Sequence, residues 1–232
     1  MRVRATVLSA FVMVAGALSA CGTSSGGSDY TGHGRLIDDL VQQVDSGSDR
    51  SYTAEYLLGG EGDLATVVRE TDPDRVAFLF PGGRYVVTEE YSMSCTPAKV
   101  SRCVLQPATD PSPTPAANVL TELDGERFLS VHTVMGWLTE AAASSSVTIT
   151  SQTRTIAGAH STCVNVTGAE NSRVSSFEAC VTDTGLLGSF SGDVDGQPRS
   201  VILTSISSTV DPDVFTIPDE VAVIDERTSS PT

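Results

Sequence analysis

The sequence predicts an α+β fold in which one antiparallel sheet curls into an incomplete barrel and a helical lid is inserted between two runs of strands. Two stretches of short β-prone segments, 51–106 and 147–210, are divided by turns rich in Gly, Pro and Asp. Between them, a proline-rich stretch is followed by apolar residues at spacings of three and four, which predicts helix. Because an apolar sheet face must be covered, we expect these helices on the concave side of the sheet.

The first 20 residues have the composition of an export signal. Arg2 and Arg4 precede an apolar run that ends in small residues, and Leu18-Ser19-Ala20-Cys21 resembles the bacterial lipobox. We expect residues 1–20 to be a lipoprotein signal peptide and Cys21 to be acylated, as in palmitate-bearing lipoproteins, on the extracytoplasmic face of the cell membrane. The alternative is an ordinary signal peptide or an uncleaved helix, but the apolar run is shorter than the about 20 residues that a spanning helix needs.

By composition, the remainder of the chain divides into a tether, a domain and a tail. Residues 21–32 are rich in Gly and Ser and predict a flexible tether, 33–224 have the length of one domain, and 225–232 predict a disordered polar tail. The formal charge is −15, and removing residues 1–20 takes away two arginines and no acidic residue, which lowers it to −17. Such an acidic surface disfavours nucleic acid and anionic headgroups, so the acyl chain is the expected membrane attachment.

Four of the five cysteines remain when Cys21 is lipidated, and an exported chain with an even number of cysteines favours disulfides. The sequence alone leaves three pairings open. We expect the local one, Cys95 with Cys103 and Cys163 with Cys180, because each would bridge neighbouring strands across a short connection. No Cys-x-x-Cys pattern occurs, which argues against a redox motif or a zinc knuckle.

The elements follow from periodicity and turn residues. An amphipathic helix is expected over 33–44, with its apolar stripe on the sheet. The first run of strands is predicted at 52–58, 64–70, 75–80, 84–95 and 100–106.

The proline-rich stretch 107–115 cannot lie inside a sheet or helix, so it is expected to cross the surface. Helices are predicted at 118–123 and 126–143, the second with one wide apolar face. The second run of strands is predicted at 147–156, 161–166, 175–182, 186–194 and 200–210.

Three segments carry a resemblance to a known family. They are Cys163-Val164-Asn165-Val166, the stretch from Phe177 through Asp183-Thr184-Gly185 to Leu187, and Val210-Asp211-Pro212-Asp213-Val214-Phe215-Thr216-Ile217-Pro218. With the order of elements, they resemble the LolA-like lipoprotein and lipid carriers, in particular the actinobacterial lipoproteins of the LppX/LprG type. The resemblance covers about residues 34–221.

The resemblance implies a membrane-anchored envelope protein that binds or transfers the acyl chains of a lipid or lipoprotein under the helical lid. Its implied partners are that ligand and an envelope transporter or acceptor protein. The residues expected to line the site are Tyr56, Val67, Phe78, Phe80, Val86, Phe128, Leu129, Val131, Met135 and Leu138. The same residue types would also fill a solid core. The alternative is therefore a protein-binding or sensory module of the RseB type, without lipid cargo.

No catalytic pattern supports an enzyme. His33, His132 and His160 lie far apart and outside metal-ligand spacings, so we expect neither a metal nor a cofactor. Glu89 and Glu90 are adjacent in a predicted strand and would point to opposite faces, which excludes a carboxylate pair acting on one bond.

Overall fold

The computed structural model describes residues 28–59, 62–96, 101–108, 127–169, 173–219 and 221–227. The signal peptide, Cys21, the tether up to residue 27 and the helix expected at 118–123 lie outside the described residues. Most of the proline-rich stretch, 109–115, also lies outside them.

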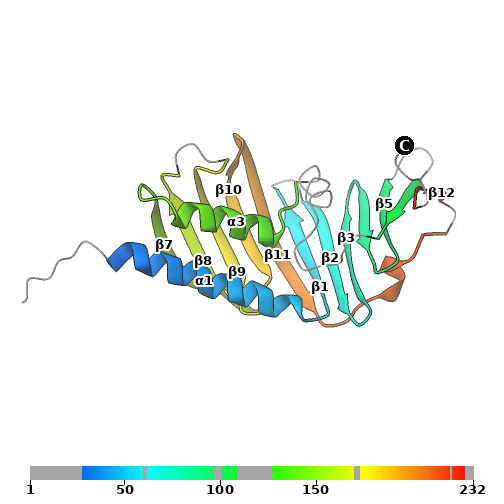
Figure 1. The fold of residues 1–232 in the computed structure, drawn as a ribbon, viewed down its shortest axis with the longest axis horizontal. Helices are drawn as coiled ribbons and strands as arrows, with labels where there is room; N and C mark the ends of the chain where they lie inside the picture. Colours follow the sequence, from blue (N-terminus) through cyan, green and yellow to red (C-terminus); the bar gives the residue numbers. More distant parts are fainter. Residues whose placement is uncertain are drawn as a thin grey trace, which may run out of the picture.

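The described strands form one sheet built from two antiparallel meanders (Figure 1). The first meander comprises β1 (Tyr52–Leu58), β2 (Asp63–Thr71), β3 (Asp74–Phe80), β4 (Gly83–Val87), β5 (Tyr91–Thr96) and β6 (Arg102–Pro107). The second comprises β7 (Thr148–Ile156), β8 (Ala159–Thr167), β9 (Ser176–Thr182), β10 (Leu187–Val194) and β11 (Gln197–Ser207). β1 pairs with β11, so the strand order is β12-β6-β5-β4-β3-β2-β1-β11-β10-β9-β8-β7, with β12 being Ala222–Asp225.

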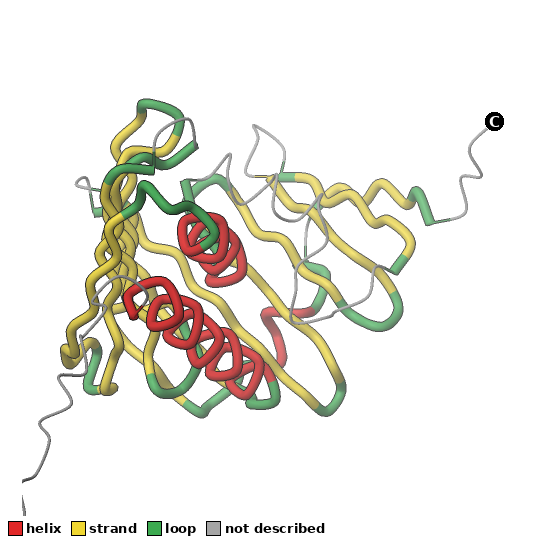
Figure 2. The backbone as a smooth tube through the Cα atoms, turned by 60° about the vertical axis from the view of Figure 1, so that its left-hand side comes forward, coloured by secondary structure: helices red, strands yellow, loops and turns green. Residues whose placement is uncertain are grey.

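The sheet is curved and open, with two helices on one face (Figure 2). α1 (Ser28–Ser48) and α3 (Val131–Ala142) pack against each other and lie across the half of the sheet that contains β7–β11 (Figure 1). α3 falls between β6 and β7 in the chain, as the expected lid does. The predicted fold class is confirmed. Among the described residues, neither helix is both long and apolar enough to cross a membrane.

Both helices differ in extent from the prediction. α1 begins at Ser28 rather than at 33, so the last five residues of the expected tether are helical, because a packed helix propagates over flanking residues that composition alone assigns to a linker. α3 begins at Val131 because Ser130 caps it, its Oγ accepting the N–H of Thr133 at 3.1 Å. Phe128 and Leu129 therefore precede the helix instead of belonging to it.

The single strand predicted over 84–95 is two strands, β4 and β5. Thr88 forms the turn between them: its Oγ1 accepts the N–H groups of Glu90 and Tyr91, at 3.2 and 3.1 Å. Such a side chain to backbone turn needs neither Gly nor Pro, and the sequence therefore carries no strong turn signal here. Glu89 and Glu90 lie in this turn and are exposed, so the strand geometry assumed for them was wrong.

The C-terminal segment adds structure that the sequence did not predict. A short 3₁₀ helix, η1 (Pro212–Phe215), is followed by β12, which pairs in parallel with β6. Asp225 belongs to β12, and the N–H of Glu226 donates to the carbonyl of Leu105 at 2.8 Å. The expected tail thus begins in the sheet; residues 228–232 lie outside the described residues.

The buried residues form two clusters, one on each face of the sheet. The helix-side core lies between the sheet and the two helices. The outer-face core lies under the C-terminal segment and comprises Val68, Ala77, Val86, Met93, Cys103, Leu105 and Phe215.

Candidate functional site

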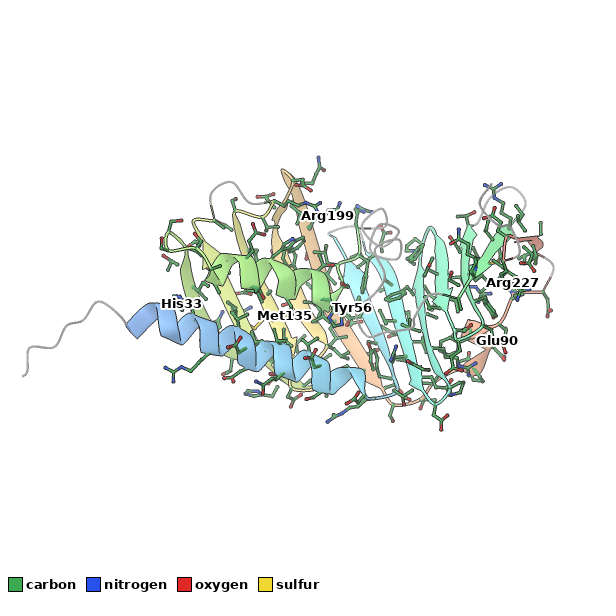
Figure 3. All side chains as sticks on the ribbon, in the orientation of Figure 1. His33, Tyr56, Glu90, Met135, Arg199 and Arg227 are labelled. Carbon is green, nitrogen blue, oxygen red and sulfur yellow. A yellow bond between two sulfur atoms is a disulfide. The ribbon has the colours of Figure 1, made fainter. Side chains whose placement is uncertain are left out.

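The helix-covered face of the sheet is the site that the sequence predicted for an apolar ligand. α1 contributes Ile37, Leu40 and Val44 to it, all buried and spaced three and four residues apart. α3 contributes the buried residues Val134, Met135, Leu138 and Ala141. Tyr56 and Met135, both labelled in Figure 3, belong to the same buried cluster.

Seven of the ten expected lining residues are buried members of the helix-side core: Tyr56, Val67, Phe78, Phe128, Leu129, Met135 and Leu138. Phe80 and Val131 are half-buried against the same cluster. The structure thus brings nine of the ten together, as packed residues of a core.

Val86 lies on the other face, and its expected role as a lining residue is wrong. It pairs with Ala77 in β3 and Met93 in β5, and all three belong to the outer-face core. Tyr85 and Val87 lie instead on the side of the sheet that carries the helices. The sequence did not reveal this because residues 85–87 are all apolar and buried, and alternation cannot assign faces to a strand that is covered on both sides.

Aromatic rings pack in the helix-side core just before the start of α3 and beside its middle. The Phe128 ring meets Tyr56 edge-on, with the ring centroids 5.2 Å apart, and lies 6.3 Å from Phe78. Trp137 lies 5.4 Å from Phe190, which stacks on Phe177 at 5.7 Å. These distances are those of aromatic pairs in contact, so at these two places side chains that were candidates to line a ligand site pack against each other.

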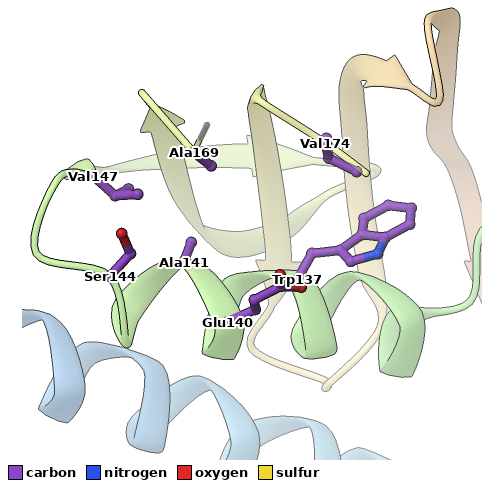
Figure 4. A pocket seen from close by; sticks show the side chains of 7 residues that line it. All are labelled: Trp137, Glu140, Ala141, Ser144, Val147, Ala169 and Val174. Atoms are coloured by element: carbon purple, nitrogen blue, oxygen red, sulfur yellow. The ribbon is translucent and has the colours of Figure 1, made fainter. Parts of the chain in front are cut away.

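A small pocket opens at the C-terminal end of α3 (Figure 4). It is lined by Trp137, Glu140, Ala141, Ser144, Val147, Ala169 and Val174, and its cavity volume is about 60 Å³. Ligand pockets for small molecules are typically about 300 to 1,000 Å³, and a cavity that holds benzene is about 150 Å³. This pocket accommodates one partner side chain or ordered water, and it is too small for an acyl chain.

Two tyrosines of β1, Tyr52 and Tyr56, have raised pKa values. Burial raises the pKa of Tyr52 to about 12, against the lowering effect of the Arg69 charge. Burial also raises the pKa of Tyr56 well above its usual value, and the nearby Tyr52 adds to this effect. Both phenols therefore stay neutral at physiological pH, and the nearby charge of Arg69 is paired with Asp74 at 2.7 Å.

On the opposite face, the C-terminal segment covers the first meander. Tyr91 donates its hydroxyl to the carbonyl of Phe215 at 2.8 Å, and Arg84 donates to the carbonyls of Val214 and Thr216 at 3.3 and 3.0 Å. The guanidinium of Arg75 lies 4.2 Å from the centre of the Phe215 ring. The segment is thus held as part of the fold.

An exposed aliphatic row crosses the same face beyond the C-terminal segment. Leu57 pairs with Leu64 on one side and with Ile202 on the other. Leu64 is 61% exposed and Ile202 is 43% exposed, while Leu57 between them is half-buried. Exposed aliphatic side chains that lie close together are a feature of protein-binding surfaces.

Both expected disulfides are present. Cys95 and Cys103 face each other on β5 and β6, and Cys163 and Cys180 on β8 and β9. Each cross-links adjacent strands, so they serve the sheet rather than the pocket.

The histidines do not come together. His33 lies near the start of α1, at the other end of the molecule from Glu90 and Arg227 (Figure 3), while His132 is on α3 and His160 on β8. Within the described part of the chain, no three His, Cys, Asp or Glu residues are grouped so that they could hold a metal ion.

The fold and these surfaces define an open half-barrel: a curved sheet with helices on one face and a C-terminal strap on the other. No protein-family model matches the chain, and no curated protein matches it. Among solved structures, it is similar to an uncharacterized conserved protein from Thermus thermophilus, with 11% identity and a TM-score of 0.48 over 82% of this chain and 99% of that one.

The chain is also similar to MucB, with 16% identity and a TM-score of 0.48. In the Pseudomonas aeruginosa MucA/MucB complex the values are 15% and 0.47. These two matches cover 82% of this chain and 66% and 63% of the other chains, so the chain spans less than two thirds of each. Because these TM-scores are below 0.5, we draw no conclusion about function from them.

Proposed function

We propose that the chain is a lipoprotein of the cell envelope, anchored through acylated Cys21 at the outer side of the membrane, whose half-barrel domain binds another protein and catalyses no reaction. The filling of the helix-covered face carries the proposal. Phe128 packs on Tyr56 and Phe78, and Trp137 packs on Phe190, where a lipid carrier would need a void. The exposed side chains of Leu64 and Ile202, on either side of the half-buried Leu57, support protein binding.

Binding of an acyl chain, as in carriers of the LppX/LprG type, is the second candidate. One observation favours it: Phe80 and Val131 are only half-buried at the margin of a wide apolar face. A shift of α3 away from this margin would open space for a chain, and each buried methylene would contribute about 0.8 kcal/mol.

The anchor is tested by Cys21→Ala in the full chain. The variant is expected to leave the membrane fraction and to lose labelling by a palmitate analogue. If it stays in the membrane fraction with wild-type yield, the anchor is refuted.

The binding function is tested in host membranes with a photo-crosslinking residue at Ile202. Ile217, of similar exposure at 38% against 43%, is the matched control on the C-terminal segment. A discrete protein adduct at Ile202, together with native mass spectra of the purified domain free of lipid, is the expected result. Stoichiometric lipid without any protein adduct would replace this proposal with the second candidate.

A further inference from the structure

β7 is an end strand of the sheet, and it is nine residues long. Among the described residues, it pairs with β8 on one side and with no strand on the other. Every residue from 150 to 155 is exposed. A long sheet edge is therefore open to solvent.

The register shows which backbone groups point outward. The Cα atoms of Cys163 and Cys180 are 3.9 Å apart, the close spacing of a non-hydrogen-bonded pair between β8 and β9. Cys163 therefore directs its N–H and C=O to its other neighbour, Gln152 of β7. Because the direction alternates along a strand, residues 149, 151, 153 and 155 direct their N–H and C=O groups away from the sheet.

Within the described residues, this edge lacks several of the features by which natural proteins protect end strands. β7 contains no Pro, Gly or Lys, and its pairing with β8 has no bulge. Six of its nine residues are Thr or Ile, which favour strands. Its one charge, Arg154, is neutralised by Glu178, with contacts of 2.6 and 2.9 Å. By contrast, β12 at the other end of the sheet has only four residues.

The charge of the chain disfavours a second copy as the occupant. Each copy without its signal peptide carries a formal charge of −17, so two copies repel each other. In the view of Figure 1, the first turn of α1 extends past β7 on the helix-covered side of the sheet.

We propose that the outer edge of β7 is the docking site for an extended segment of the partner protein, which joins the sheet as an additional strand. The inference rests on the proposed protein-binding function and names the surface and the chemistry of the partner. That segment is uncharged and rich in β-branched residues where it meets Ser151, Thr153 and Thr155, and has basic flanks that complement the acidic domain.

The probe is a synthetic peptide of alternating Thr and Val with two Lys at each end, titrated against the full chain without its signal peptide. Thr153→Pro removes an outward N–H that β8 does not use, whereas Thr153→Ala keeps that N–H. Saturable binding is expected, weakened at least about tenfold by Thr153→Pro and less than about threefold by Thr153→Ala, because backbone groups make the contacts.

Residue-resolved hydrogen exchange keeps the test decisive if Thr153→Pro unfolds the domain. In the free protein the amides of residues 151, 153 and 155 are expected to exchange faster than those of 150, 152 and 154, and bound peptide should slow the odd-numbered set at least about tenfold.

Unchanged exchange of the odd-numbered set, or no saturable binding at millimolar peptide, would overturn the proposal. Protection that appears with protein concentration alone would assign the edge to a second copy. A protein adduct at Ile202 that persists in Thr153→Pro would refute this edge and leave the proposed function standing.

Discussion

At the scale of single residues, Phe215 shows how the C-terminal segment is attached. Its side chain is 1% exposed, in the outer-face core, with the Arg75 guanidinium over its ring. Tyr91 and Arg84 bind the backbone around it. Ile217, two residues on, is 38% exposed although it is also large and apolar. Position relative to the sheet, and not residue type, decides which of the two stabilises the fold.

Phe215→Ala is expected to lower the free energy of unfolding by about 3 to 5 kcal/mol, because it leaves a cavity against β3–β5. The measurement is the midpoint of urea unfolding. Ile217→Ala, the matched control, is expected to change stability by no more than about 0.5 kcal/mol. Equal effects of the two substitutions would contradict the packing described for this segment.

At the scale of elements, α1 is seated by a close approach between two glycines. Gly47, near its end, meets Gly185 in the turn between β9 and β10: a Cβ on Gly47 would lie 2.7 Å from the Gly185 Cα. Gly185 has a φ of +81°, which favours glycine. The side-chain amide of Gln43 also donates to the carbonyl of Thr182. The helix therefore docks on this hairpin through its backbone.

Gly47→Ala is expected to destabilise the domain by about 1 to 3 kcal/mol, because the added methyl forces α1 away from the hairpin. Gly34→Ala on the same helix has no atom within 4 Å of the new Cβ and is expected to stabilise by up to about 1 kcal/mol through helix propensity. Thermal unfolding of the two variants measures both effects. If the unfolding temperature shifts in the same direction in both variants, the close approach of Gly47 to Gly185 is not the cause of the change in stability.

At the scale of the whole molecule, the two faces of the sheet are covered by different parts of the chain. Helices before and between the meanders cover one face, and the C-terminal segment covers the other. The titration of Tyr52 and Tyr56 of β1 measures whether the helix-covered face stays folded as pH rises. Lys99 is the chain's only lysine, so tyrosines dominate its titration above pH 10.

Stability is expected to be unaffected by Tyr52 and Tyr56 below pH 10 and to fall as pH rises from 10 towards 12. Above pH 10 the unfolded chain releases these protons while the folded chain, with its raised pKa values, retains them. The loss is about 1.4 kcal/mol per pH unit for each tyrosine. Urea unfolding across this range, with tyrosinate absorbance, measures it. Tyr52→Phe should reduce the slope by about one proton, and an unchanged slope would contradict the burial of this phenol.

Much of the fold was predictable because its signals are local. Turns such as Pro81-Gly82 and Asp195-Gly196 separate neighbouring strands, so the two meanders follow from the sequence. Of the three cysteine pairings that the sequence left open, the expected local one is confirmed, and each pair lies on strands that are consecutive in the chain. Nine of the ten proposed lining residues were correctly placed on one side of the sheet, because helical stripes and most strand faces alternate visibly.

What the sequence by itself determined is the class of fold and the order of most of its elements, both set by residues close together in the chain. It left three cysteine pairings open, and the structure shows the local one. Only the tertiary structure decided that β1 pairs with β11 and that Val86 lies on the face opposite the helices. It also decided that the C-terminal segment returns to cover the outer face and that aromatic rings pack in the helix-side core. The physical reason is that these features depend on contacts between residues far apart in the chain. The same apolar residue types can line a ligand site, fill a solid core or lie on either face of a sheet that is covered on both sides, so residue type alone does not distinguish these outcomes.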